Sequence, residues 1–191
     1  MVATANIMGQ SILAKPAPGA KNLSRLRRSG LHACYSTPPV PNGAHMQKIT
    51  PFLWFNDNAD EAMRFYCSVF KNSKPGKAGG MLVTFELEGQ EFFALNGGPQ
   101  FPFTEAVSLF VKCENQAEVD YYWEKLLAGG GKPSQCGWLK DRFGLSWQIV
   151  PNRLGELLGD KDPQRASRAM QAMLKMSKIV VADLERAAAG G

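Results

Sequence analysis

Histidine is nearly missing from this sequence, and the two histidines present lie before the region that carries a folding pattern. They are His32 and His45, so no histidine follows Met46. Imidazole is the commonest side-chain ligand of catalytic metals in proteins. The absence argues against a conventional His-ligated metalloenzyme, and we expect neither a metal nor another cofactor.

Long apolar runs and paired cysteines are missing as well. Every apolar stretch is broken by Gly, Asn or a charged residue before the roughly 18 residues that a bilayer span needs. The four cysteines form no CxxC pair, and the region after residue 45 holds an odd number, Cys67, Cys113 and Cys136. We therefore expect no membrane partner, and reduced thiols inside a cell rather than a disulfide framework.

Acidic residues are absent from the leader, residues 1–45, which carries five Lys and Arg. This leaves 17 of the 22 basic residues against 17 Asp and Glu in the remainder, which is formally neutral, so we expect no nucleic-acid partner. A basic, acid-free leader containing Arg and Ser is typical of an organellar transit peptide and predicts a mitochondrial location. The alternatives are a wrong start codon or a cloning scar, with Met46 as the true start and a cytoplasmic protein.

The region after the leader contains one pattern of strand, helix and strands twice. In the first copy, the β-rich run 49–55 precedes a capping-box pattern at Asn58 to Glu61 and an apolar stripe at helical spacing. Runs 81–87 and 91–95, joined by Gly89-Gln90, predict a hairpin.

The second copy begins with a strand at 107–111 and a capping pattern at Asn115 to Glu118, about 57 positions after the first. Gly129 to Gly131 end its helix, and a hairpin forms around Asp141-Arg-Phe-Gly144. Such spacing indicates an internal duplication. We expect three parts: the leader 1–45, a duplicated domain 46–151, and a helical appendage 152–191.

The appendage begins with Asp162 as helix cap and Pro163 as first helical residue. Its predicted apolar face consists of Ala166, Met170, Met173 and Leu174. The methionines Met170, Met173 and Met176 favour an adaptable packing face against the domain or a second subunit over a ligand site.

The duplication and the closing phrase Gly137-Trp-Leu-Lys-Asp-Arg-Phe-Gly-Leu-Ser-Trp-Gln-Ile-Val-Pro151 resemble the glyoxalase/bleomycin-resistance superfamily, also called vicinal oxygen chelate. The opening Ile49-Thr-Pro-Phe-Leu-Trp-Phe-Asn-Asp and the middle Phe92-Phe-Ala-Leu-Asn-Gly-Gly-Pro narrow the resemblance to the PhnB-like branch, often described as 3-demethylubiquinone-9 3-methyltransferase domain proteins.

The resemblance implies an α+β fold of two βαβββ modules plus C-terminal helices, assembled as a homodimer. Each module's sheet packs a helix on one face and lines a cavity with the other. The stretch between Phe70 and Met81 is short, so the first module is expected to be shortened and to lack its second strand.

The superfamily's metal-ligand positions fall on residues that bind metals weakly. The resemblance places Thr50 at the first His position, and Gln148 at the position of the closing Glu ligand. Neither is a strong ligand for a divalent cation.

Strand alternation assigns further side chains to the cavity. If Phe93 and Leu95 face the helix, Asn96 faces the cavity. The predicted ligand-binding residues are Thr50, Phe52, Trp54, Asn96, Ser108 and Gln148. Neutral polar groups among aromatic ones suit a small, flat or apolar organic molecule better than a cation.

Other candidate residues have simpler structural interpretations. Trp54 and Trp138 would stack on a ligand or belong to the core. Cys136 has no histidine to act as its base, and Asp141 is typical of a turn whose side chain caps the local backbone. Gly129 to Gly131 follow a helix, whereas phosphate and S-adenosylmethionine loops follow a strand.

Three functions remain open on the sequence. The first is a small-molecule-binding protein that does not depend on a metal. The second is an enzyme, either a metal-independent isomerase or lyase or a protein of quinone metabolism, which would need a titratable group in the cavity. The third is an interaction protein that works through the Met-rich C-terminal helix.

Overall fold

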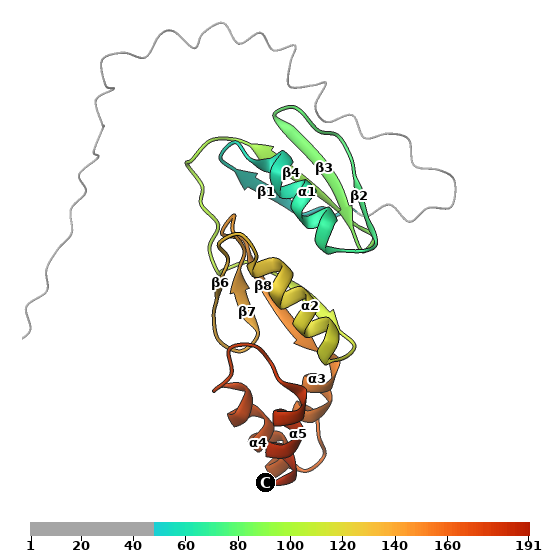
Figure 1. Ribbon diagram of the computed structural model, residues 1–191, viewed down its shortest axis with the longest axis vertical. Helices are drawn as coiled ribbons and strands as arrows, with labels where there is room; N and C mark the ends of the chain where they lie inside the picture. The colour runs from blue at the N-terminus through green and yellow to red at the C-terminus, as the bar shows by residue number, and fades with distance from the viewer. Residues whose placement is uncertain (1–47) are drawn as a thin grey trace, which may run out of the picture. The chain divides into compact units, whose positions relative to one another are not determined.

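A computed structural model describes residues 48–191 (Figure 1). None of the helices in this part of the chain has the length and apolar character to cross a membrane. Its elements are β1 (Phe52–Phe55), α1 (Ala59–Val69), β2 (Ser73–Pro75), β3 (Leu82–Leu87), β4 (Gln90–Asn96), β5 (Ser108–Cys113), α2 (Gln116–Leu127), β6 (Lys132–Pro133), β7 (Trp138–Lys140), β8 (Ser146–Pro151), α3 (Asn152–Leu158), α4 (Pro163–Met173) and α5 (Val181–Ala189).

The two sheets have the same topology, which confirms the duplication. Sheet A runs in the order β1-β4-β3-β2 and sheet B in the order β5-β8-β7-β6. In each, the first strand pairs in parallel with the fourth, and the remaining pairs are antiparallel. The fold is therefore α+β, with two βαβββ modules followed by C-terminal helices.

The second strand of the first module is present, although the sequence predicted its loss. Strand β2 needs only three residues, because it lies at the edge of sheet A and pairs with β3 alone. Two side-chain contacts hold it there: Lys74 forms a 3.0 Å ion pair with Glu86, and the Ser73 hydroxyl donates to the Cys67 carbonyl at 3.0 Å. The module is shortened but complete.

The predicted hairpin of sheet A turns one residue earlier than expected. Glu88 and Gly89 lie between β3 and β4 with φ values of 48° and 80°. A two-residue turn with positive φ at both positions matches the right-handed twist of paired strands. Gly89 occupies such a conformation at little cost, which fixes the register of the hairpin.

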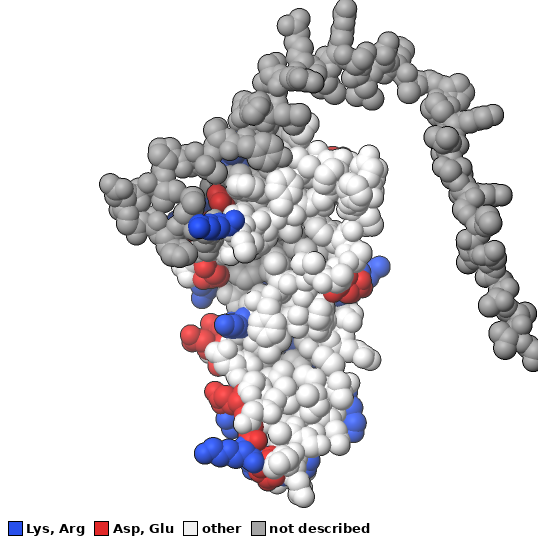
Figure 2. All heavy atoms as spheres, turned by 180° about the vertical axis from the view of Figure 1, so that it is seen from behind, with Lys and Arg blue, Asp and Glu red and all other residues white. Residues whose placement is uncertain are grey.

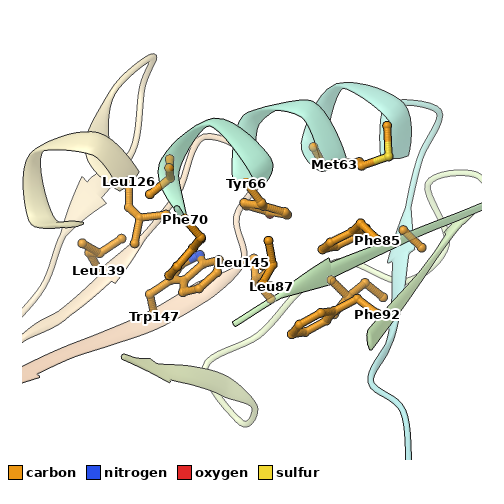
Figure 3. Packing of buried hydrophobic residues seen from close by; sticks show 14 of the residues in the cluster. Met63, Tyr66, Phe70, Phe85, Leu87, Phe92, Leu126, Leu139, Leu145 and Trp147 are labelled. Carbon is orange, nitrogen blue, oxygen red and sulfur yellow. The ribbon is translucent and has the colours of Figure 1, made fainter. Parts of the chain in front are cut away.

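Helix α1 covers one face of sheet A, contacts Trp147 of sheet B and supplies much of the core (Figure 3). Its buried residues recur three or four positions apart: Ala59, Ala62, Met63, Tyr66 and Val69. In the same view its aromatic side chains point toward Phe85 of sheet A and Trp147 of sheet B. Tyr66 lies 5.9 Å from the Phe85 ring and 5.4 Å from the Trp147 ring, so one helix packs against both modules.

The C-terminal helices form a small core of their own beside sheet B. Its buried residues are Leu154, Leu157, Ala169, Ile179, Leu184 and Ala188, and Val150 of β8 packs against them. Asp162 caps α4 as predicted, because its carboxylate accepts the Gln164 backbone N–H at 2.8 Å. The buried face of α4 is rotated by about one residue from the predicted one. Ala169 is buried, whereas Met170 and Leu174, which were predicted to face the core, are exposed.

One buried carboxylate, that of Asp141, links α1 of the first module to sheet B of the second. Asp141 is 3 % exposed, and its Oδ2 accepts hydrogen bonds from the Tyr66 hydroxyl of α1 and the Trp147 indole of β8, both at 2.8 Å. Its Oδ1 accepts the Phe143 and Leu145 backbone N–H groups at 2.8 and 3.1 Å. Asp141 therefore has the structural turn role that the sequence predicted, and it also ties α1 to sheet B.

Replacing Tyr66 with Phe should destabilise the protein more than replacing Tyr121 with Phe. Tyr66 donates to a carboxylate, whereas Tyr121 donates to the neutral Val69 carbonyl at 2.9 Å. We expect losses of about 1.5–3 kcal/mol and about 0.5–1.5 kcal/mol respectively. Urea unfolding followed by circular dichroism measures both, and an equal loss in the two variants would show that Asp141 does not join the modules.

Candidate functional site

The open face of each sheet, opposite its helix, is where the resemblance places a binding site. In sheet A, Leu53 and Phe55 are buried toward α1, so Phe52 and Trp54 point to the open face. Strand register pairs Phe52 with Phe93 and Trp54 with Leu95, and paired residues share a face. Phe52 and Trp54 thus lie on the side of β1 that alternation predicted, and their role in binding stays a prediction.

The predicted orientation of β4 is wrong, because Asn96 faces the helix side of sheet A and not the open face. Asn96 is therefore not part of the candidate site. Asn96 pairs with Phe55 on the helix side of sheet A. Its Oδ1 accepts the Ala59 N–H at 2.8 Å and its Nδ2 donates to the Gly80 carbonyl at 3.0 Å. Asn96 thus caps α1, a role expected for Asn58, whose side chain makes no capping hydrogen bond.

Trp54 is anchored by residues that follow β4, whereas no contact within residues 48–191 identifies a role for Thr50. The Trp54 indole donates to the Gly98 carbonyl at 2.8 Å, and its ring lies edge-on to Phe101 with centroids 4.9 Å apart. Trp54 is therefore held in place by the loop after β4. Thr50 is half-buried and lies two residues before β1.

The open face of sheet B carries two rows of side chains that cross its strands. Register places Ser108, Ser146 and Lys140 in one row, and Phe110, Gln148 and Trp138 in the next. The Gln148 amide donates to the Ser108 hydroxyl at 2.8 Å. The structure thus brings together Ser108 and Gln148, two of the predicted polar residues, beside two aromatic rings.

Lys140 is a residue of this face that the sequence interpretation missed. Leu139 is buried in the core, so alternation along β7 turns Lys140 to the open side. Its ammonium group forms a 2.7 Å ion pair with Glu105, which lies in the loop before β5. This hydrogen bond lowers the pKa of the Glu105 carboxyl. The same alternation, applied to β7, would have identified Lys140.

The donor set of the open faces does not fit a divalent metal. The two positions implied by the resemblance hold the hydroxyl of Thr50 and the amide of Gln148, and the Gln148 amide already donates to Ser108. Metal ions of this class select imidazole, thiolate or carboxylate ligands. Within residues 48–191 there is also no group of three His, Cys, Asp or Glu side chains that could hold a metal.

A wide groove of about 700 Å³ lies between the two modules and includes Phe110 of sheet B. It is lined by the end of α1, the tip of the β3–β4 hairpin, β5 and the start of α2. Two of its acidic side chains already serve the fold: Glu88 accepts from the Asn72 amide at 2.9 Å, and Glu118 accepts the Glu114 N–H at 2.8 Å. Its other charged residues are Lys71, Lys112 and Glu114.

Charge is unevenly spread over the surface of the domain. Figure 2 shows a face that is mostly uncharged, with Asp, Glu, Lys and Arg gathered toward its edges. The large hydrophobic side chains that remain exposed include Phe52 at 46 % and Phe110 at 53 %. The leader, with both histidines and its predicted transit peptide, lies outside the described residues.

Comparison with known proteins agrees with this architecture. Residues 47–150 match the protein family described as 3-demethylubiquinone-9 3-methyltransferase. One similar solved structure is a PhnB protein from Bacillus cereus, described as a proposed 3-demethylubiquinone-9 3-methyltransferase. It is 38 % identical in sequence to this chain, with a TM-score of 0.50, and the match covers 55 % of this chain and 99 % of that one.

Two more distant structures are similar in fold. One is a glyoxalase/bleomycin resistance protein from Albidiferax ferrireducens, 15 % identical with a TM-score of 0.42, covering 51 % of this chain and 92 % of its own. The other is the fosfomycin resistance protein FosX from Listeria monocytogenes, in complex with Mn(II) and sulfate, 16 % identical with a TM-score of 0.43, covering 55 % and 88 %. No curated protein sequence matches the chain.

The cysteines of the domain are poor candidates for a nucleophile. Burial, together with the nearby Glu118 carboxylate, raises the pKa of Cys113 to about 12. Burial also raises the pKa of Cys67. A thiol acts as a nucleophile only in its thiolate form, so both are inert near neutral pH.

Iodoacetamide at pH 8 should leave Cys113 unmodified in the folded protein, because only about 1 in 10,000 of its thiols is ionised there. Mass spectrometry of tryptic peptides measures the modification, with the half-buried Cys136 as internal reference. Unfolding in urea should make Cys113 react like Cys136. Equal reaction of the two in the folded protein would contradict the burial of Cys113.

Proposed function

The chain belongs to the PhnB-like family described as 3-demethylubiquinone-9 3-methyltransferase, within the glyoxalase/bleomycin-resistance superfamily, and on that premise we propose that it binds a small organic molecule without a metal. The observation that carries the proposal is the Ser108–Gln148 pair on the open face of sheet B. Gln148 stands where the resemblance places the closing Glu ligand, and the pair offers hydroxyl and amide groups instead.

The surroundings of this pair favour a flat or apolar ligand. Phe110 and Trp138 occupy the same row as Gln148. The hydrogen bond to Ser108 uses one N–H of Gln148, and the amide has a second N–H and a carbonyl oxygen for a ligand. Aromatic surface with a few oriented polar groups is the usual composition of a small-molecule site.

An enzyme acting without a metal, as an isomerase or lyase or in quinone metabolism, is the alternative. Such an enzyme needs a group that can hold or transfer a proton. Lys140 on the open face of sheet B is such a group. Because it lies on β7, it was not predicted by alternation along the strands that became β1, β4, β5 and β8. The methyltransferase description gains no support from Gly129 to Gly131, which connect α2 to β6 rather than a strand to a helix.

A homodimer is part of the proposal, because each sheet ends in a strand with an exposed aromatic residue. Among the described residues, β1 pairs only with β4 and β5 only with β8. Phe52 lies on the first edge and Phe110 on the second. Exposed edge strands with large apolar side chains are prone to pair with another chain. We infer that β1 of one copy lies beside β5 of its partner.

The third hypothesis, a protein that binds a partner through the Met-rich C-terminal helix, has less support. Met173 and Met176 pack against the core of the C-terminal helices, and only Met170 of the three is exposed. A partner surface built on these methionines would thus have a single anchor.

Replacing Gln148 with Ala should reduce a ligand-induced rise in melting temperature. Thermal-shift screening with quinones, planar aromatic drugs and α-keto acids identifies a binder, and the variant removes the amide that would orient it. We expect binding to weaken by about tenfold, the value of one net hydrogen bond. The matched control, Gln171→Ala on the exposed side of α4, should retain the shift.

Two outcomes would refute this proposal. One is a ligand shift that survives unchanged in Gln148→Ala. The other is stoichiometric zinc, nickel or iron that remains on the purified protein after dialysis, since the site would then be a metal centre.

Light scattering should give the mass of two chains for the native protein and of one chain for Phe52→Glu or Phe110→Glu. A charge buried at the edge-to-edge contact without a partner would weaken association by at least ~100-fold. Leu174→Glu is the control, because Leu174 is exposed on α4, outside both sheets, and this variant should remain dimeric. A native protein with the mass of one chain would disprove the dimer.

A further inference from the structure

Three hydrogen-bond donors lie in one row across the open face of sheet B. Ser108 of β5 is the register partner of Ser146 of β8, which is in turn the register partner of Lys140 of β7. Neighbouring strands lie about 4.8 Å apart, so the two hydroxyl groups and the ammonium group start from adjacent backbone positions on the same side. Such a set suits an oxyanion, which accepts several hydrogen bonds at once.

The middle residue of this row lacks a partner. The Ser146 side chain is 1 % exposed, and its hydroxyl oxygen has no hydrogen-bond partner in the described structure. Buried polar groups nearly always have a partner, so an exception calls for an absent one. In contrast, the hydroxyl of Ser108 in the same row receives the Gln148 amide.

The end residue of the row already holds a carboxylate. Lys140 binds Glu105 at 2.7 Å, and the Glu105 side chain is 67 % exposed. An exposed ion pair is worth little, because solvent screens it and both side chains lose freedom. Glu105 can therefore leave Lys140 at small cost when another carboxylate arrives.

Lys140 also borders a cavity of about 300 Å³ with aromatic walls. The cavity is lined by residues of both modules, among them Trp54, Phe101 and Phe143. Trp54 and Phe101 meet edge-on at 4.9 Å and are fixed by the indole hydrogen bond to Gly98. Lys140 is the one charged residue among the lining residues of this cavity. One cation at the end of an aromatic cavity selects a ligand with an apolar ring and one negative charge.

We propose that this cavity binds a small aromatic carboxylate, whose carboxylate group displaces Glu105 from Lys140 and extends past the cavity lining toward Ser146, the register partner of Lys140, while its ring contacts Trp54. This assignment rests on the proposed function, because Lys140 lines the cavity and also lies on the open face of sheet B that carries Ser108 and Gln148. Glu105 then acts as an internal competitor that occupies Lys140 in the absence of ligand.

Titration calorimetry with 2-naphthoate and its neutral amide, 2-naphthamide, tests the ligand class. The native protein should bind 2-naphthoate at least tenfold more tightly than the amide, since only the acid is charged. Equal affinity for both compounds would overturn the carboxylate assignment and leave the proposed function standing. Failure of both compounds, together with the whole thermal-shift panel, would overturn the proposed function itself.

Variants of the ion pair should change the affinity for 2-naphthoate in opposite directions. Glu105→Gln removes the competitor and should tighten binding by about threefold to tenfold, whereas Lys140→Gln should weaken it at least tenfold and leave the amide unaffected. The matched controls are Glu156→Gln and Lys178→Gln, which remove ion pairs to Arg153 and Asp120 elsewhere on the surface. A Glu105→Gln variant that binds 2-naphthoate no more tightly than the native protein would overturn the competition.

The role of Ser146 is tested by Ser146→Ala, which removes one oxygen atom from a buried position. Binding of 2-naphthoate should weaken about threefold to tenfold. The melting temperature of the ligand-free variant should be unchanged or raised, because the buried Ser146 hydroxyl makes no hydrogen bond that the substitution would remove. Unaltered affinity, or a lower melting temperature of the free variant, would show that Ser146 serves the fold rather than the ligand.

Discussion

The buried carboxylate of Asp141 determines how the duplicated halves of this protein meet. It accepts four hydrogen bonds. One donor lies in α1 of the first module, and the other three lie in the second module, in the turn between β7 and β8 and in β8 itself. Burial raises the pKa of Asp141, while the bonds from Trp147, Tyr66 and the two backbone N–H groups lower it. Burial and the Asp141 charge likewise raise the pKa of Tyr66, which stays a hydrogen-bond donor. A carboxylate placed so deeply is tolerable only when all its donors are present, so α1 must lie against sheet B.

This constraint also decides which surfaces remain open. Because α1 packs on sheet A and also contacts sheet B, the helix sides of both modules form one continuous core (Figure 3). Within residues 48–191, the C-terminal helices that reach Val150 are the helices that pack against one of the opposite faces. Large apolar side chains such as Phe52 and Phe110 are left exposed on these faces. The faces proposed to bind a ligand are thus left open by the way the core is joined.

Sequence patterns predicted those parts of the site in which polar and apolar residues alternate clearly. Strand β8 alternates between core residues such as Trp147 and Ile149 and the polar Gln148, so its orientation was correct. Strand β4 reads Phe92-Phe-Ala-Leu-Asn96, apolar at four successive positions, and such a run has no preferred face.

Two other features depend on contacts between residues far apart in the chain. Asn96 caps a helix that begins 37 residues earlier, and no local rule connects it to Ala59. Strand β2 has three residues and low intrinsic preference for a strand, and it forms because β3 offers an edge. Both were mispredicted for the same reason: local sequence carries no information on a partner that only the folded chain supplies.

The two modules have diverged in chemistry while keeping one topology, and this divergence explains how a duplicated scaffold gains a ligand preference. The register pair Phe52–Phe93 of sheet A corresponds to the pair Phe110–Gln148 of sheet B. The first pair is wholly aromatic, with ring centroids 6.1 Å apart, and the second combines a ring with an amide that is held by Ser108. Sheet A therefore contributes apolar surface and sheet B contributes the polar groups. The cavity lined by Trp54 and Lys140 draws on both modules and combines aromatic side chains with one charged side chain. Two identical modules would each offer the same groups, so this asymmetry would orient a ligand that the cavity binds.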